Sequence, residues 1–92
     1  DVVAFSLYPE TKPNHYELLK LDINSIIGDI RNKEQLRNVI NEHKPEIVFH
    51  LAAQALVRCS YENPIETLET NIIGTANVFE VCRKSDSVKA IV

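Results

Sequence analysis

Short apolar runs alternate with helical patterns along this chain of 92 residues, and the alternation restricts its fold more than any other feature. Apolar runs begin near Val2, Ser25, Glu46 and Val88, and helical patterns lie between them. Parallel strands need crossover connections, which are usually helices and almost always right-handed. The sequence therefore predicts an α/β fold with a doubly wound parallel sheet.

The composition is typical of a globular chain, with 45% hydrophobic residues and a formal net charge of −3. No basic stripe is present that could neutralise phosphates, so nucleic acid is not an expected partner. No apolar run reaches the ~18 residues of a membrane span and no signal peptide is visible, so we expect no membrane association. Cys59 and Cys82 lie too far apart for a paired metal-ligand motif, and free thiols fit a cytoplasmic protein.

A capping signal marks the first long helix. Asn32, with Gln35 three residues later, forms a capping-box pattern at the end of a strand predicted for residues 25–30. This helix must end before Pro45. The strand predicted next, residues 46–51, is apolar on both faces, which is typical of a parallel strand covered on both sides.

The longest predicted helix begins at Asn63-Pro64, with Glu66 placed to complete a second capping box. Gly74 lies inside this helix, where glycine costs about 1 kcal/mol relative to alanine. We expect the compensation to be close packing against another backbone or a ligand. The stripe predicted to face the core consists of Ile65, Leu68, Ile72, Ala76 and Phe79.

Three predicted strand ends carry residues that fit a ligand site: Ser6, Asp29-Ile30 and the Leu-Ala-Ala-Gln segment 51–54. In an open parallel sheet, ligands bind outside the carboxyl ends of the strands, so these ends should open on one edge. Two consecutive alanines after a buried strand indicate that something lies close to the backbone there. Gln54 behind them can both donate and accept hydrogen bonds.

The motifs GDI, HLAAQALVR, SYENPIETLETNIIGT and VKAIV, in this order and spacing, resemble the extended short-chain dehydrogenases/reductases. Within that family the chain is most similar to the nucleotide-sugar 4,6-dehydratases, in particular to those that act on CDP-glucose. The resemblance covers essentially the whole chain and implies an NAD(P)-binding Rossmann fold. It also implies a lyase reaction by internal redox, in which hydride leaves C4 of the hexose for NAD+, water is eliminated across C5–C6, and hydride returns to C6.

The resemblance assigns cofactor contacts to two of the strand ends. Asp29 and Ile30 would contact the adenine of the dinucleotide. The small side chains of the following segment would let the cofactor lie along the backbone at its ribose and nicotinamide half. That segment consists of Leu51, Ala52, Ala53 and Gln54.

Three further residues have roles implied by the same resemblance. Thr70 would approach the cofactor, and Asn71 would brace the site through hydrogen bonds. Ser6 stands where many family members have an acid that holds the adenosine ribose hydroxyls. NAD is the expected cofactor, and the absence of that acid leaves NADP as an alternative.

Other residues that could suggest chemistry have simpler interpretations. Tyr16 and Lys20 fit the Tyr-x-x-x-Lys pattern of the family's catalytic pair, but they precede the strand at residues 46–51, whereas the family's pair follows the strand that begins at Val88. We expect no catalytic role for them. His50 is expected to be a core or rim histidine.

By the same resemblance, residues 1–92 are a fragment of the dinucleotide-binding domain. The first strand with its glycine-rich loop would precede Asp1, and the catalytic residues would follow Val92. The chain alone is therefore expected to be inactive, while the whole protein would bind a nucleotide-sugar substrate and form a homo-oligomer. Two alternatives remain open: another nucleotide-sugar epimerase or dehydratase, such as GDP-mannose dehydratase, and a non-catalytic dinucleotide-sensing Rossmann protein.

Overall fold

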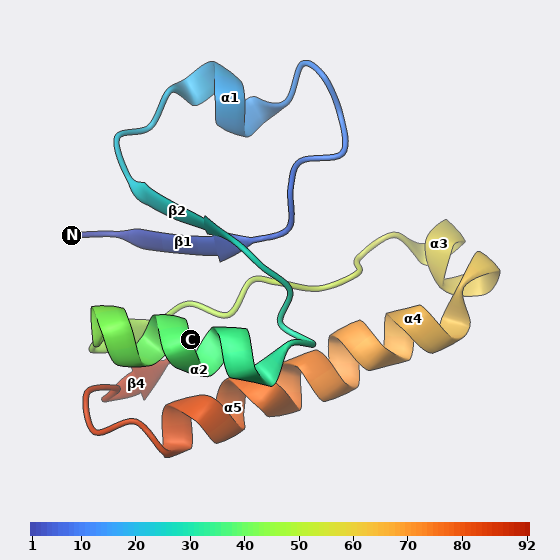
Figure 1. Cartoon of the computed structure of the whole chain (residues 1–92). Coiled ribbons are helices and arrows are strands. Elements are labelled where there is room, and N and C mark those ends of the chain that lie inside the picture. The colour runs from blue at the N-terminus through green and yellow to red at the C-terminus, as the bar shows by residue number, and fades with distance from the viewer.

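The strands of the chain form two parallel pairs (Figure 1). In the computed structural model, which describes residues 1–92, β1 (Val3–Ser6) pairs with β2 (Asn24–Ile27) and β3 (Ile47–Val48) pairs with β4 (Ala90–Ile91). No strand lies between the two pairs, so the edges of β1 and β3 that point away from their partners are unpaired. The predicted parallel α/β architecture is confirmed, with its sheet present as two halves.

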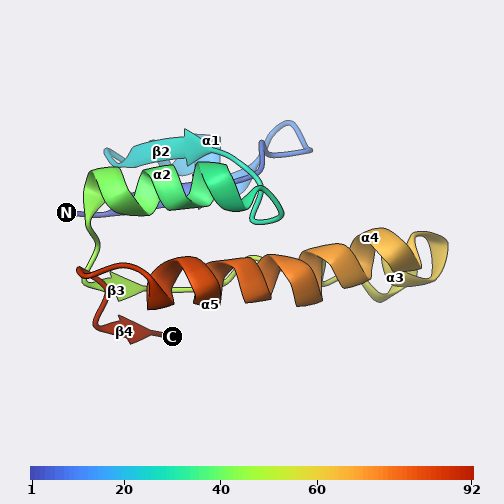
Figure 2. The same ribbon diagram turned by 60° about the horizontal axis from the view of Figure 1, so that its bottom comes forward.

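The helices connect these strands as the alternation predicts. They are α1 (His15–Leu19), α2 (Lys33–His43), α3 (Val57–Glu62), α4 (Pro64–Leu68) and α5 (Thr75–Arg83), with a π-helical turn, η1 (Glu69–Gly74), between the last two. The segments α4, η1 and α5 run on as one continuous helical rod (Figure 2). We call residues 64–83 the rod. None of the helices is long and apolar enough to cross a membrane.

The capping box at the start of α2 is half formed. The side chain of Asn32 accepts a hydrogen bond from the backbone N–H of Gln35 at 3.1 Å, as predicted. The Gln35 side chain, however, donates to the carbonyl of Ile27 at 2.8 Å, and the Asn32 N–H is bound to the Asp29 carbonyl. Gln35 therefore ties the helix start to the end of β2. That strand ends at Ile27 and not at Ile30, so Asp29 and Ile30 lie in the loop after it.

The second predicted capping box does not form. The Asn63 side chain makes no cap hydrogen bond. Its backbone N–H, which Glu66 would accept in a capping box, instead closes the unpredicted helix α3 by donating to the Cys59 carbonyl at 2.8 Å. Pro64 at the first helical position remains the start signal of the rod.

The hydrophobic core lies between α2 and the C-terminal half of the rod. In Figure 1 these helices lie on one side of the β1–β2 pair, and α1 lies on the other. Partly buried residues of the strands, including Phe5 and Val48, pack against this core. Its six buried members are Ile30, Leu36, Ile40, Val78, Val81 and Cys82.

The predicted core stripe of the long helix is wrong. Its large members are exposed, from 51% for Leu68 to 68% for Ile65, and the buried face carries Gly74, Val78, Val81 and Cys82 instead. The rod has apolar residues on more than one face, and the π turn shifts its register, so periodicity alone could not identify the covered face. The prediction for the segment 46–51 fails in the same way, since Phe49 and Leu51 are exposed and only Ile47–Val48 form a strand.

Gly74 is explained by a side chain. A Cβ atom at this position would lie 2.5 Å from Cδ1 of Ile30, so the glycine makes room for a core residue and not for a backbone or a ligand. The loop after β2 is thereby docked onto the rod.

We predict that Gly74→Ala destabilises the full-length protein by about 1–3 kcal/mol, because the added methyl group overpacks the contact with Ile30. The gain in helix propensity, about 1 kcal/mol, opposes this effect. Urea unfolding measures the change, and Ile30→Val, which removes the nearest atom, should partly rescue it. An unfolding free energy of Gly74→Ala equal to or above the wild-type value would contradict this packing.

Candidate functional site

The three strand ends singled out in the sequence are joined by contacts in the structure. The arrows of β2, β3 and β4 point the same way in Figure 2, and β1 is parallel to β2. The Ser6 carbonyl accepts the N–H of Gly28 at 2.9 Å, which joins the end of β1 to the loop after β2. The rod contacts both that loop and the segment after β3, so all three ends lie along one edge, as expected.

Asp29 is held by its neighbour Arg31. Its Oδ1 accepts the backbone N–H of Arg31 at 2.8 Å, and its Oδ2 accepts Nε and Nη2 of the guanidinium at 2.9 and 2.6 Å. Hydrogen bonds from the Arg31 side chain keep the pKa of Asp29 below its usual value. Asp29 is therefore a charged acceptor at neutral pH, half-buried at the end of β2.

The loop around Ile30 is fixed by the rod. The side chain of Ile30 is buried against Gly74, and Nδ2 of Asn77 donates to the carbonyls of Ile30 and Arg31, both at 3.1 Å. A contact of Ile30 with a ligand would have to use its main chain, because the side chain belongs to the core.

The segment after β3 is bound to the rod through two of its residues, His50 and Gln54. Asn71 and Gln54 form a reciprocal pair, in which Oδ1 of Asn71 accepts the Gln54 N–H at 2.8 Å and Nδ2 donates to the Gln54 carbonyl at 3.0 Å. Upstream, His50 Nε2 lies 2.8 Å from Oγ1 of Thr75, and its ring meets Phe79 edge-on. His50 is half-buried and hydrogen-bonded, as a rim histidine should be.

The Gln54 amide turns back onto its own segment. Its Oε1 accepts the Leu56 N–H at 2.6 Å, while Nε2 donates to the Leu56 carbonyl and to Oγ1 of Thr67. The sequence suggested an amide free to bind a ligand, but in the structure it mainly shapes the turn that follows. Between the two anchors, Leu51 and Ala53 are exposed and Ala52 packs on the core.

The remaining predicted residues lie close to these loops. Ser6 is exposed at the end of β1, and Thr70 is half-buried in the π turn beside Asn71. Tyr16 lies in α1, and Lys20 follows that helix in the left-handed conformation, with φ of 47°. The Tyr-x-x-x-Lys pair is thus carried by the connection between β1 and β2.

Arg31 and Asn77 were missed by sequence reasoning although they hold the loop after β2. The one available signal was the Asp-x-Arg spacing at a helix entry, where a carboxylate can meet both the backbone and the side chain two residues on. Nothing in the sequence around Asn77 indicates that its amide reaches a loop 46 residues away.

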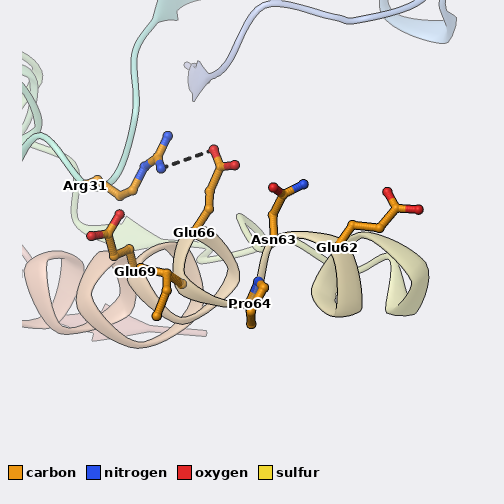
Figure 3. A pocket seen from close by; sticks show the side chains of 7 residues that line it. Arg31, Glu62, Asn63, Pro64, Glu66 and Glu69 are labelled. Carbon is orange, nitrogen blue, oxygen red and sulfur yellow. Dashed lines mark hydrogen bonds and ion pairs between the residues drawn. The ribbon is translucent and has the colours of Figure 1, made fainter.

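Arg31 also borders a surface pocket of about 450 Å³ (Figure 3). In Figure 3 its guanidinium points toward Glu66, and Nη1 lies 3.3 Å from Oε1 of that residue. The other lining residues come from α3, η1 and the start of α4, and they include Glu62 and Glu69. Three carboxylates against one guanidinium make the pocket unfavourable for phosphate groups.

Comparison with known proteins shows the family to which the chain belongs. Residues 7–92 match the model of the family described as GDP-mannose 4,6 dehydratase. The chain belongs to this family. Its solved relatives have the dinucleotide-binding Rossmann fold, and the partial parallel sheet found here is part of that fold.

Individual relatives are nucleotide-sugar enzymes. The chain is 50% identical over 99% of its length to CDP-glucose 4,6-dehydratase of Salmonella typhimurium, and 40% identical over 65% of its length to CDP-paratose 2-epimerase of Salmonella typhi. Among solved structures it is similar to UDP-glucose 4-epimerase of Thermus thermophilus in complex with NAD, with a TM-score of 0.73, 32% identity and 86% of the chain covered. The chain spans about a quarter or less of the length of these relatives: 26% of the Salmonella typhimurium dehydratase, 25% of the Thermus epimerase and 18% of the Salmonella typhi epimerase.

We predict that Asn71→Ala in the full-length protein releases the segment after β3. The change leaves the N–H and carbonyl of Gln54 unpaired, which costs about 1–3 kcal/mol, so the exchange rate of this amide should rise roughly tenfold or more. Hydrogen exchange followed by mass spectrometry of peptides covering 51–56 measures the effect. Asn38→Ala, on the exposed face of α2 with no side-chain hydrogen bond, is the matched control; equal exchange in the two variants would contradict the role of Asn71.

Proposed function

We propose that this chain is part of the dinucleotide-binding domain of an NAD-dependent nucleotide-sugar 4,6-dehydratase, a lyase that acts on CDP-glucose. The observation that carries the proposal is the 50% identity to the Salmonella typhimurium CDP-glucose 4,6-dehydratase, which extends over 99% of the chain. The epimerase relatives reach 44% identity over 70% of the chain, and the Thermus epimerase structure has 32% identity, so the dehydratase is favoured by both identity and coverage.

Two features support assigning the chain to a larger domain. The free edges of β1 and β3 offer main-chain hydrogen bonds to one further parallel strand. The exposed apolar side chains of Ile47, Phe49 and Leu51 lie at alternate positions, as residues on one face of an extended strand do, and further parts of a domain could cover them. The chain has only two glycines, Gly28 and Gly74, so it contains no glycine-rich phosphate loop. We propose that the strand between the halves carries this loop and that the catalytic residues lie beyond the strand near Val88.

The residues of this chain would hold the adenosine and ribose parts of the cofactor. Asp29 supplies a charged acceptor at the end of β2, and the exposed Ala53 with the neighbouring Ala52 leaves the main chain accessible beside the rod. Ser6, Ile30, Leu51, Gln54 and Thr70 complete the proposed contacts, and Asn71 braces them through Gln54.

In the reaction proposed for the whole enzyme, the sugar undergoes no net oxidation or reduction. When bound, NAD+ would supply a hydride acceptor and, within the same cycle, a hydride donor. C4 of the hexose is oxidised to a ketone and C6 is reduced to a methyl group with loss of one water. Within this chain, the proposed residues bind and orient the cofactor, and no proton transfer is assigned to them.

Activity of the full-length protein tests the proposal. We expect NAD(H) to copurify, as detected by mass spectrometry, and CDP-glucose to yield a keto product lighter by one water. Copurification of NADP(H) in place of NAD(H) would change the assignment of the cofactor to NADP. A product of unchanged mass would indicate an epimerase, and a protein that binds dinucleotide without turnover would indicate a sensor; either result contradicts the dehydratase assignment.

A second part of the proposal is that the protein is a homo-oligomer built on the rod. Large apolar side chains are exposed along α3 and the rod, and monomers rarely expose contiguous patches of more than a few hundred Å². A second copy would cover the same stripe on both partners. The stripe consists of Leu56, Val57, Tyr61, Ile65, Leu68, Ile72 and Phe79.

We predict that Leu68→Glu in the full-length protein lowers the molar mass measured by light scattering to that of one chain, because it buries a charge in the apolar contact. Leu18→Glu is the matched control, since Leu18 is 67% exposed on α1, away from the rod. An unchanged mass for Leu68→Glu, or equal dissociation by both variants, would contradict an interface on the rod.

A further inference from the structure

Arg31 makes more contacts with Asp29 than an ordinary surface pair would. It supplies three donors to one carboxylate, and the shortest, from Nη2 to Oδ2, is 2.6 Å. Charge-assisted hydrogen bonds from a guanidinium to a carboxylate are among the stronger ones in proteins, and here both side-chain donors converge on the single oxygen Oδ2. The side chains are only 33% and 26% exposed, so solvent screens this pair less than a fully exposed one.

The carboxylate of Asp29 keeps one defined direction for a further donor. An ionised carboxylate has about four acceptor positions. Oδ2 receives two donors from the guanidinium, and Oδ1 receives one from the backbone N–H of Arg31. The remaining position is on Oδ1, at the carboxyl end of β2, and it suits a neutral N–H donor because Arg31 already balances the charge.

Arg31 is itself fixed from the rod. Asn77 binds its carbonyl at 3.1 Å, and Nη1 reaches Glu66 at 3.3 Å. The contact with Glu66 is long and exposed, so it contributes little. The main-chain contact and the fork onto Asp29 therefore determine where the carboxylate points.

We propose that Arg31 is a positioning residue that fixes Asp29 so that Oδ1 receives the exocyclic amine of adenine, and that it thereby sets the preference for adenine over bases with a carbonyl at that position. The inference rests on the proposed function, since it concerns the adenine end of the same dinucleotide site. A carbonyl there would place an oxygen against the carboxylate, so the amine is favoured and the carbonyl is repelled. Without the fork, Asp29 could rotate away from either base.

The test compares dissociation constants of NAD+ and of nicotinamide hypoxanthine dinucleotide, in which a carbonyl replaces the amine, for the full-length enzyme by calorimetry. We expect the wild type to bind NAD+ about tenfold or more tightly than the analogue, since a lost hydrogen bond costs on the order of 1.4 kcal/mol. In Arg31→Met the ratio should fall toward one, mainly through weaker binding of NAD+. Arg31→Lys, which keeps the charge without the fork, should give an intermediate ratio.

Arg37→Met is the matched control, because Arg37 lies on α2 with 58% of its side chain exposed and only a 3.8 Å contact with Glu34. It should keep the wild-type ratio. If Arg31→Met weakens both dinucleotides equally, Arg31 has a merely structural role and the inference fails; if that variant does not fold, an unchanged ratio in Arg31→Lys overturns it. A wild type that binds both dinucleotides equally also overturns the inference, whereas a wild type that binds neither overturns the proposed function itself.

Discussion

The contact of the rod with two loops determines the arrangement of the candidate site. Gly74 makes room for Ile30 and Asn77 binds the carbonyls of the loop after β2, while Asn71 binds the main chain of Gln54 after β3. These three rod residues are spaced three apart, so each is a neighbour of the next on the helix surface. The π turn contains Asn71 and Gly74, and such turns often occur at functional sites. A single helical element thus sets the distance between the two strand ends.

The local features of this arrangement could be predicted from the sequence. The parallel strands, the cap at Asn32 and the rod starting at Pro64 all have short-range causes: periodic apolar residues, a side chain that replaces a missing backbone partner, and a proline that fits the first helical turn. The meeting of Asp29 and the Ala-Ala segment at one edge also followed, because parallel strands put their carboxyl ends together.

The features that failed depend on long-range packing. Ile65 and Leu68 fit a core stripe by spacing, yet their face of the rod is exposed. The prediction failed because the rod has two apolar faces and the spacing does not say which of them meets α2. The division of the sheet into two halves could not be predicted either, because it depends on which strand pairs with the free edge of β1. Arg31 was missed although the Asp-x-Arg spacing was a weak signal for its contact with Asp29. The hydrogen bond from Asn77 to its carbonyl leaves no pattern in the sequence.

We propose that the loop after β2 and the segment after β3 together form one dinucleotide-binding edge. Hydrogen exchange of the full-length protein with and without NAD+ tests this most directly. We expect added protection in residues 28–31 and 51–54, and none in residues 85–89, which enter β4 from the opposite edge. Unchanged exchange in both loops, or protection that appears at 85–89 instead, would contradict the account.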